Sequence, residues 1–92
     1  MNLEVRHAPD RSRYELVHAG EVVGIAEYVD DGEHLVFPHT VIDPDRRGGG
    51  LGAVLVKGAL DDVRRQGRTV VPTCWFVAEF LDLHPEYADL RA

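Results

Sequence analysis

The residues whose type and spacing point most directly to chemistry form a glycine-rich segment, Arg46-Arg47-Gly48-Gly49-Gly50-Leu51-Gly52, between a predicted strand and a predicted helix. Glycines carry no Cβ, so their backbone N–H groups can approach phosphate oxygens closely. The free N–H groups and the dipole of a first helical turn favour an anion there, and two arginines add charge. Gly50 and Gly52 each cost about 1 kcal/mol relative to alanine in or beside that turn. The segment therefore predicts an anion site rather than a plain flexible turn.

Other phosphate and metal motifs do not fit these residues. No Gly-Lys-Ser/Thr follows the glycines, which excludes a Walker loop, and a dinucleotide fingerprint would need a second βαβ unit. His34, His39 and Cys74 do not have a recognisable zinc spacing, so we expect no metal site.

The chain before the glycines reads as antiparallel strands joined by tight turns. The predicted strands are residues 14–17, 22–29 and 33–43, with 3–7 as an added edge strand and 8–12 as a turn or loop. Gly20 suits a turn that needs positive φ. Residues 22–29 are apolar on both faces at their centre, which predicts a strand covered on both sides. Pro38 lacks a ladder donor, which predicts a bulge or irregularity near Pro38-His39.

The chain after the glycines changes to helical periodicity. Small or apolar residues at 51, 54, 55, 58, 59 and 63 form the stripe of an amphipathic helix, and Gly67 is placed to cap it. Residues 68–73 read as a strand parallel to residues 35–43. A last helix is expected from Trp75 to Leu83, with its aromatic residues in the core, before Pro85 starts a new turn. The fold class is α+β: an antiparallel meander, a glycine loop, a helix, a parallel strand and a C-terminal helix.

Length and composition bound the kind of protein. The 92 residues, taken as 1–92, fit one domain. A net charge of -6 argues against nucleic acid as a partner. No signal peptide or membrane-spanning apolar run is recognisable, and one cysteine makes no internal disulfide, so we expect a cytoplasmic protein. The oligomeric state stays open, with a homodimer as one option.

Several segments together resemble a known family. Arg47-x-x-Gly50-x-Gly52, preceded by Val41-Ile42-Asp43-Pro44, is similar to the acetyl-CoA signature of the GNAT N-acetyltransferases. The segments at 39–41, 71–74 and 84–87, read with the glycine loop, resemble a short, stand-alone GNAT-like group across residues 12–90. The resemblance implies a GNAT-like fold and one acetyl-CoA-binding domain.

The resemblance also implies a binding mode and an activity. The strand at Thr40, Val41 and Ile42 would hydrogen-bond the pantetheine arm. The pyrophosphate would be held by a contiguous set of residues: Arg46, Arg47, Gly48, Gly49, Gly50, Leu51, Gly52 and Ala53. The leading hypothesis is an acetyl-CoA-dependent N-acetyltransferase acting on a small amine or a protein amine. The alternatives are a module that carries or senses CoA thioesters without turnover, and a structural domain whose loop holds stray anions.

Two side chains are candidates for the chemistry. Histidine is the side chain most often used as a general base, and His39 lies on the strand expected beside the thioester, so it is a candidate base. The alternative is a strand histidine packed in the sheet. Cys74 is expected at a helix start near the site, as an acyl acceptor, a proton donor to the thiolate, or a buried apolar residue. The helix at 75–83 lacks the tyrosine that many GNAT enzymes use as a general acid, and Tyr87 lies further on. The N-terminal helices that shape the acceptor site in longer GNAT enzymes have no counterpart here.

Overall fold

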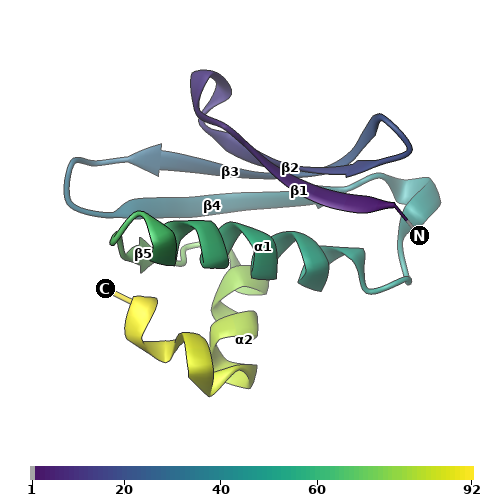
Figure 1. Cartoon of the computed structure of the whole chain (residues 1–92). Helices are drawn as coiled ribbons and strands as arrows, with labels where there is room; N and C mark the ends of the chain where they lie inside the picture. The colour runs from purple at the N-terminus through teal and green to yellow at the C-terminus, as the bar shows by residue number, and fades with distance from the viewer. Residues whose placement is uncertain (1) are drawn as a thin grey trace.

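The computed structural model describes residues 2–92 and holds a five-stranded mixed sheet with two α-helices in that range (Figure 1). The order along the chain is β1 (Leu3–Ala8), β2 (Arg13–His18), β3 (Glu21–Asp30), β4 (Leu35–Ile42), α1 (Leu51–Arg65), β5 (Val70–Val71) and α2 (Trp75–Leu83). Short 3-10 turns lie at Pro9–Arg11, Pro44–Arg46 and Pro85–Leu90. This is the α+β arrangement predicted from the sequence, including the edge strand at the N-terminus.

The strands lie in the sheet in their sequence order. Strands β1 to β4 are antiparallel, and β5 runs parallel to β4. The parallel strand is shorter than the predicted 68–73, because Pro72 has no N–H to donate and Thr73 N–H turns back to the carbonyl of Val71 at 3.2 Å. Residues after α2 close the outer edge of β5, where Ala92 N–H donates to Val70 O at 2.8 Å.

The predicted irregularity at Pro38 is a β-bulge. Glu27 pairs with His39 and Val29 pairs with Val36, so Tyr28 alone lies opposite two residues of β4. The second of those two residues is Pro38, which cannot donate to the ladder. The bulge therefore confirms the prediction, and it sets which side chains of the following segment face which side of the sheet.

One face of the sheet is packed against α1, and the other is not covered by a helix over β1 to β3 (Figure 1). The expectation that residues 22–29 are covered on both sides is therefore wrong. Ala26 is buried on the α1 face, whereas Ile25 and Glu27 on the opposite face are only half-buried. We call that opposite side of the sheet the open face. The apolar Ile25 was misleading because one apolar residue on a sheet surface is common in soluble proteins.

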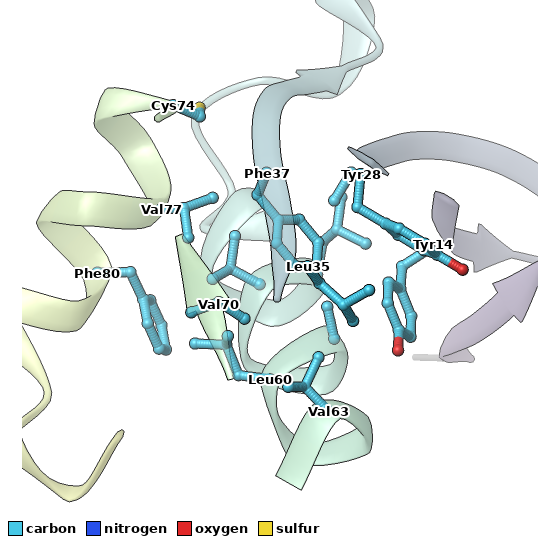
Figure 2. Packing of buried hydrophobic residues seen from close by; sticks show 14 of the residues in the cluster. Tyr14, Tyr28, Leu35, Phe37, Leu60, Val63, Val70, Cys74, Val77 and Phe80 are labelled. Atoms are coloured by element: carbon cyan, nitrogen blue, oxygen red, sulfur yellow. The ribbon is translucent and has the colours of Figure 1, made fainter. Parts of the chain in front are cut away.

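The core lies between β2 to β5 and the two helices. Phe37 packs among Tyr28, Leu35 and Val77, and Val70 lies between β4 and α2, as Figure 2 shows. Cys74 lies at the edge of this cluster, at the start of α2. The packing holds β4, α1 and the start of α2 in fixed relation, which is what the candidate site requires.

Candidate functional site

The two parallel strands part soon after they meet. Strands β4 and β5 pair only at Leu35 with Val70 and at Val36 with Val71. Further along, the carbonyl of Phe37 accepts from Cys74 N–H at 2.8 Å and from Thr73 Oγ1 at 3.2 Å. Beyond that point no strand within residues 2–92 pairs with the β5 side of β4. The gap leaves a free backbone edge next to the start of α2.

A groove of about 700 Å³ occupies this gap and runs to the glycine-rich loop. Its lining includes every site residue predicted from the sequence except Gly49: His39, Thr40, Val41, Ile42, Arg46, Arg47, Gly48, Gly50, Leu51, Gly52, Ala53 and Cys74. Trp75 and Phe76 complete the lining. Residues that are far apart in the sequence thus border one cavity, with the loop at one end and the parted strands at the other.

The glycine loop exposes a continuous row of main-chain donors. None of the backbone N–H groups of residues 47–53 reaches an acceptor within residues 2–92 with good hydrogen-bond geometry, whereas Val54 N–H bonds Gly50 O at 3.3 Å. Gly48 and Gly50 have φ of 91° and 74°, and a Cβ at either would meet open space. We call these seven N–H groups the amide row. Their number and the positive end of α1 suit a multiply charged anion such as a diphosphate.

The two arginines of the loop differ in their partners. Arg46 donates to His18 Nδ1 at 2.7 Å and lies 3.6 Å from a carboxylate oxygen of Glu21. Arg47 makes no salt bridge within residues 2–92. The structure therefore leaves Arg47 available to an incoming anion, while the charge of Arg46 is already partly compensated by the β2–β3 turn.

Aromatic residues of α2 form the opposite wall of the groove. A Cβ on Gly52 would lie 2.8 Å from Cζ of Phe76, so glycine is what allows the ring to rest on the first turn of α1. Trp75 is 71% exposed, which corrects the expectation that it belongs to the core. The exposure of Trp75 could have been predicted from the helical spacing, because Trp75 shares its face of α2 with the exposed Glu79 and Asp82.

His39 borders the groove but its side chain lies on the open face. Thr40 is the cross-strand neighbour of the buried Ala26, so the preceding residue points away from α1. On that side His39 is exposed and is the direct cross-strand neighbour of Glu27. A base in this position would receive a proton from a molecule that approaches the groove from the open face.

Cys74 lies inside the groove on the other side of β4. Its side chain is buried, and Sγ donates to Oγ1 of Thr40 at 3.7 Å. As predicted, it stands at the start of α2, where its carbonyl accepts from Ala78 N–H at 3.0 Å. The thiol and the imidazole are thus separated by the thickness of β4, which suits two different roles better than one concerted pair.

No tyrosine lines the groove within the described range. Tyr87 is buried against Phe80, and its hydroxyl donates to Asp61 of α1 at 2.6 Å. Burial, followed by this hydrogen bond, raises the pKa of Tyr87. Tyr14 and Tyr28 lie in the core and do not line the groove, and the Tyr14 hydroxyl donates to Asp62 near the C-terminal end of α1 at 2.7 Å. Among the described residues that border the groove, Cys74 is the one thiol or phenol that could donate a proton there.

Two further features of the described residues bear on ligands and surroundings. No group of three or more His, Cys, Asp or Glu within residues 2–92 is arranged to hold a metal ion. Neither α1 nor α2, the α-helices of that range, has the length and apolar character to cross a membrane.

Comparisons with known proteins agree with this geometry. A family model described as GCN5-related N-acetyl-transferase matches residues 13–90. Among solved structures, the NMR solution structure of a GCN5-like protein from Staphylococcus aureus, named as a candidate N-acetyltransferase, shares the fold with a TM-score of 0.72. The two chains are 19% identical, and the match covers 99% of this chain and 89% of that one, which establishes likeness of fold. A search of curated proteins finds no match.

Proposed function

Because this chain belongs to the GCN5-related N-acetyltransferase family, we propose that it takes an acetyl group from acetyl-CoA and transfers it to an amine. The observation that carries the proposal is the amide row: consecutive main-chain donors of residues 47–53 lie without a partner at one end of a groove. The other end of the same groove is bordered by an imidazole and a thiol. Membership of the family supports acyl transfer in general, and the groove supports the proposal that acetyl-CoA is the acyl donor.

The residues fit a CoA thioester along the length of the groove. The pyrophosphate belongs on the amide row with Arg47 beside it, since positive φ at Gly48 and Gly50 turns the backbone without side chains in the way. The pantetheine arm belongs along Thr40 to Ile42, because an amide-bearing chain can pair with a free strand edge as an added strand. The thioester then reaches the point where β4 and β5 part, near Cys74.

The chemistry assigned to this site is direct acyl transfer. The amine nitrogen forms a bond to the acetyl carbon, the carbon–sulfur bond breaks, and one amine proton passes to His39. The sulfur leaves as a thiolate and takes the proton of Cys74, whose thiol then regains a proton from solvent. The proton moves from one thiol to another, so a cysteine can take this role in a groove whose lining has no tyrosine.

Ligand binding is the first test, with CoA, acetyl-CoA and pantetheine as probes. A ligand that binds only the folded state raises the melting temperature. We expect CoA and acetyl-CoA to raise it and pantetheine, which lacks the pyrophosphate, to leave it unchanged at equal concentration. Trp75 is the one tryptophan of the chain and lines the groove, so its fluorescence gives an independent binding signal. No response to millimolar CoA in either measurement would contradict the proposal.

Turnover is the second test, followed as free-thiol release from acetyl-CoA in the presence of an amine panel. We expect His39→Gln and Cys74→Ser each to lower kcat about 100-fold or more while CoA affinity stays within about twofold. Unchanged rates would remove that residue from the mechanism. Intact-mass measurement during turnover detects acetylation of Cys74, which would replace direct transfer by a covalent route. CoA binding without any thiol release would instead favour a carrier or sensor of CoA thioesters.

We place the activity in the cytoplasm, where a lone thiol stays reduced.

A further inference from the structure

Three arginines converge on one buried carboxylate on the open face. Glu15 is 2% exposed, and it accepts from Arg13 Nε at 2.9 Å and from Arg6 Nη2 at 3.1 Å. Arg11 Nη1 lies 3.4 Å from the same carboxylate. Arg13 and Glu15 share a face because they are two residues apart on β2, and Arg6 is the cross-strand partner of Glu15 on β1. We call Arg6, Arg11 and Arg13 around Glu15 the arginine cluster.

Within salt-bridge distance, the cluster has more cations than carboxylates. Its three guanidinium groups share one carboxylate, and no second carboxylate within residues 2–92 lies within 4.0 Å of them. Elsewhere each lysine or arginine in a salt bridge pairs with a different carboxylate: Arg46, Lys57, Arg64, Arg65, Arg68 and Arg91. The excess at the cluster stands out on a chain of net charge -6. A guanidinium has five N–H donors, so the half-exposed Arg6 and Arg11 keep donors that are not bonded to Glu15 and can hold another anion.

The arginine cluster lies in line with His39 across the sheet. Arg13 is the cross-strand neighbour of Glu27, and Glu27 is the neighbour of His39 on the next strand. Neighbouring strands lie about 4.8 Å apart, so Arg13 is about 10 Å from His39 along this row. Glu27 lies between them and forms no salt bridge within the described residues. The row thus has His39 at one end, Glu27 in the middle and Arg13 of the arginine cluster at the other end.

We propose that the open face docks the acetyl acceptor and that this acceptor is an amine on an acidic polypeptide. The amine lies at His39 and Glu27, and a carboxylate or phosphate of the same segment lies on the arginine cluster. Three extended residues span about 10 Å, so the acidic group is about three residues from the acceptor amine. A polypeptide fits better than a small molecule because Arg6 and Arg11 side chains are 52% and 61% exposed on a strand surface, whereas small ligands bind in concave sites.

This inference rests on the proposed acetyl transfer, so its test compares acceptors rather than activity alone. The probes are two seven-residue peptides, blocked at both ends, with a central lysine and either glutamate or glutamine at both ends. We expect kcat/KM for thiol release to be about tenfold higher with the glutamate peptide at low salt, and the preference to shrink as salt is added. The variant Arg6→Gln with Arg11→Gln removes the two exposed cations and leaves Arg13 to hold Glu15. It should remove the preference without changing the Kd for CoA.

Matched controls separate the outcomes. Arg91→Gln removes an arginine paired with Asp82 away from this face, and it should leave the preference intact. Equal rates with both peptides, or a preference that survives the double variant, would overturn the inference while leaving acetyl transfer established.

If neither peptide is acetylated, fluorescence anisotropy of the labelled peptides decides whether the open face binds the acidic peptide in preference to the neutral one. Equal binding, or acidic binding without acetylation of any lysine, contradicts an acceptor role. Faster turnover of glutamate itself than of either peptide would overturn the assignment to a polypeptide. Absence of any CoA response would instead mark failure of the proposed function.

Discussion

The amide row and the arginine cluster both present positive potential to solvent, but they are built from different parts of the chain. The amide row uses uncharged main-chain donors of consecutive residues, oriented by glycines with positive φ and by the first turn of α1. The arginine cluster uses long side chains from β1, β2 and the turn between them, gathered by one buried carboxylate. The first needs no counter-charge, whereas the second depends on Glu15.

This difference decides how each region responds to change. Substitutions other than proline leave main-chain donors in place, so the amide row is sensitive to backbone geometry and to any side chain that enters it. The cluster is sensitive to charge, salt and pH, because guanidinium groups repel one another when their shared carboxylate is absent. Substitutions chosen for one mechanism should therefore leave the other region unaffected.

The largest expected effect is on the backbone of the glycine loop. Gly50→Ala and Gly67→Ala impose nearly the same strain, since φ is 74° and 69° and a Cβ meets open space at both positions. Each should lower the free energy of unfolding by about 1 kcal/mol. Only Gly50→Ala should weaken CoA binding, by about 30-fold or more, because its Cβ and shifted backbone disturb the amide row. Isothermal titration with CoA measures this, and similar affinities for the two variants would mean that the row does not hold the ligand.

The next effect concerns the carboxylate that gathers the arginines. Glu15→Gln should lower the free energy of unfolding at pH 7 by about 2 kcal/mol, because it removes the charge that three cations share. CoA affinity should stay unchanged. Urea denaturation gives the stability, and a variant as stable as the parent would mean that the arginines hold together without the carboxylate.

The same carboxylate gives a pH dependence with a defined sign. Hydrogen bonding from Arg13, followed by that from Arg6, outweighs the effect of burial and holds the pKa of Glu15 below its ordinary value of 4.5. Its stabilising contribution is therefore full above pH 4.5 and is lost as the pH falls through the lower value in the folded chain. We expect Glu15→Gln to lose less stability than the parent between neutral pH and about pH 3. If the parent and the variant lost the same free energy of unfolding between neutral pH and about pH 3, Glu15 would not be the source of the pH dependence.

A smaller effect is expected where α1 supports β1. A Cβ on Gly58 would lie 2.5 Å from Cγ2 of Val5, so Gly58→Ala must push β1 and with it Arg6 away from the helix. We expect a loss of about 1–2 kcal/mol in unfolding free energy and a weaker preference for acidic peptides. Combining Gly58→Ala with Val5→Ala should recover part of both losses in a double-mutant cycle. Additive losses would show that the contact with Val5 is not the cause.

The smallest expected effect is the difference in CoA affinity between variants of the two loop arginines, Arg46 and Arg47. Arg47→Ala should weaken CoA binding about three- to tenfold at low salt, and the difference should decrease with added salt. Arg46→Ala should have less effect, because this side chain is held by His18 and Glu21. Titrations of both variants at two salt concentrations measure the contrast. A larger loss for Arg46→Ala would show that ligand binding draws Arg46 away from its present partners.

Much of the candidate site could be predicted because its parts are local in the sequence. Residues 46–53 are contiguous, and the change from strand to helix periodicity at Leu51 placed them at a helix start. Cys74 lies in the short connection between β5 and α2, so topology alone brought it to the groove. Trp75 was misassigned because an aromatic residue next to a core stripe looks apolar in sequence, although its exposed face follows from the helical spacing.

Ion pairs were less predictable, even within one helix. Asp61 and Arg65 lie four residues apart on α1, the spacing of a helical ion pair, but Asp61 accepts from Lys57 and Tyr87, and Arg65 donates to Asp62. Several partners at suitable spacing compete for each charge, and small differences in side-chain geometry choose among them. The arginine cluster was missed for a related reason, since residues 8–12 read only as a turn and the pairing of Arg6 with Glu15 depends on strand register.

The sequence by itself determined the order and kind of the elements, the family and the glycine loop, because periodicity, turn residues and backbone freedom act over a few neighbouring positions. Only the tertiary structure decided that β5 parts from β4 after two residue pairs, that His39 and Cys74 lie on opposite sides of β4, and that three arginines share Glu15. Those facts depend on register, on a bulge and on which face α1 covers. Such long-range choices are set by packing of the whole chain rather than by any short segment.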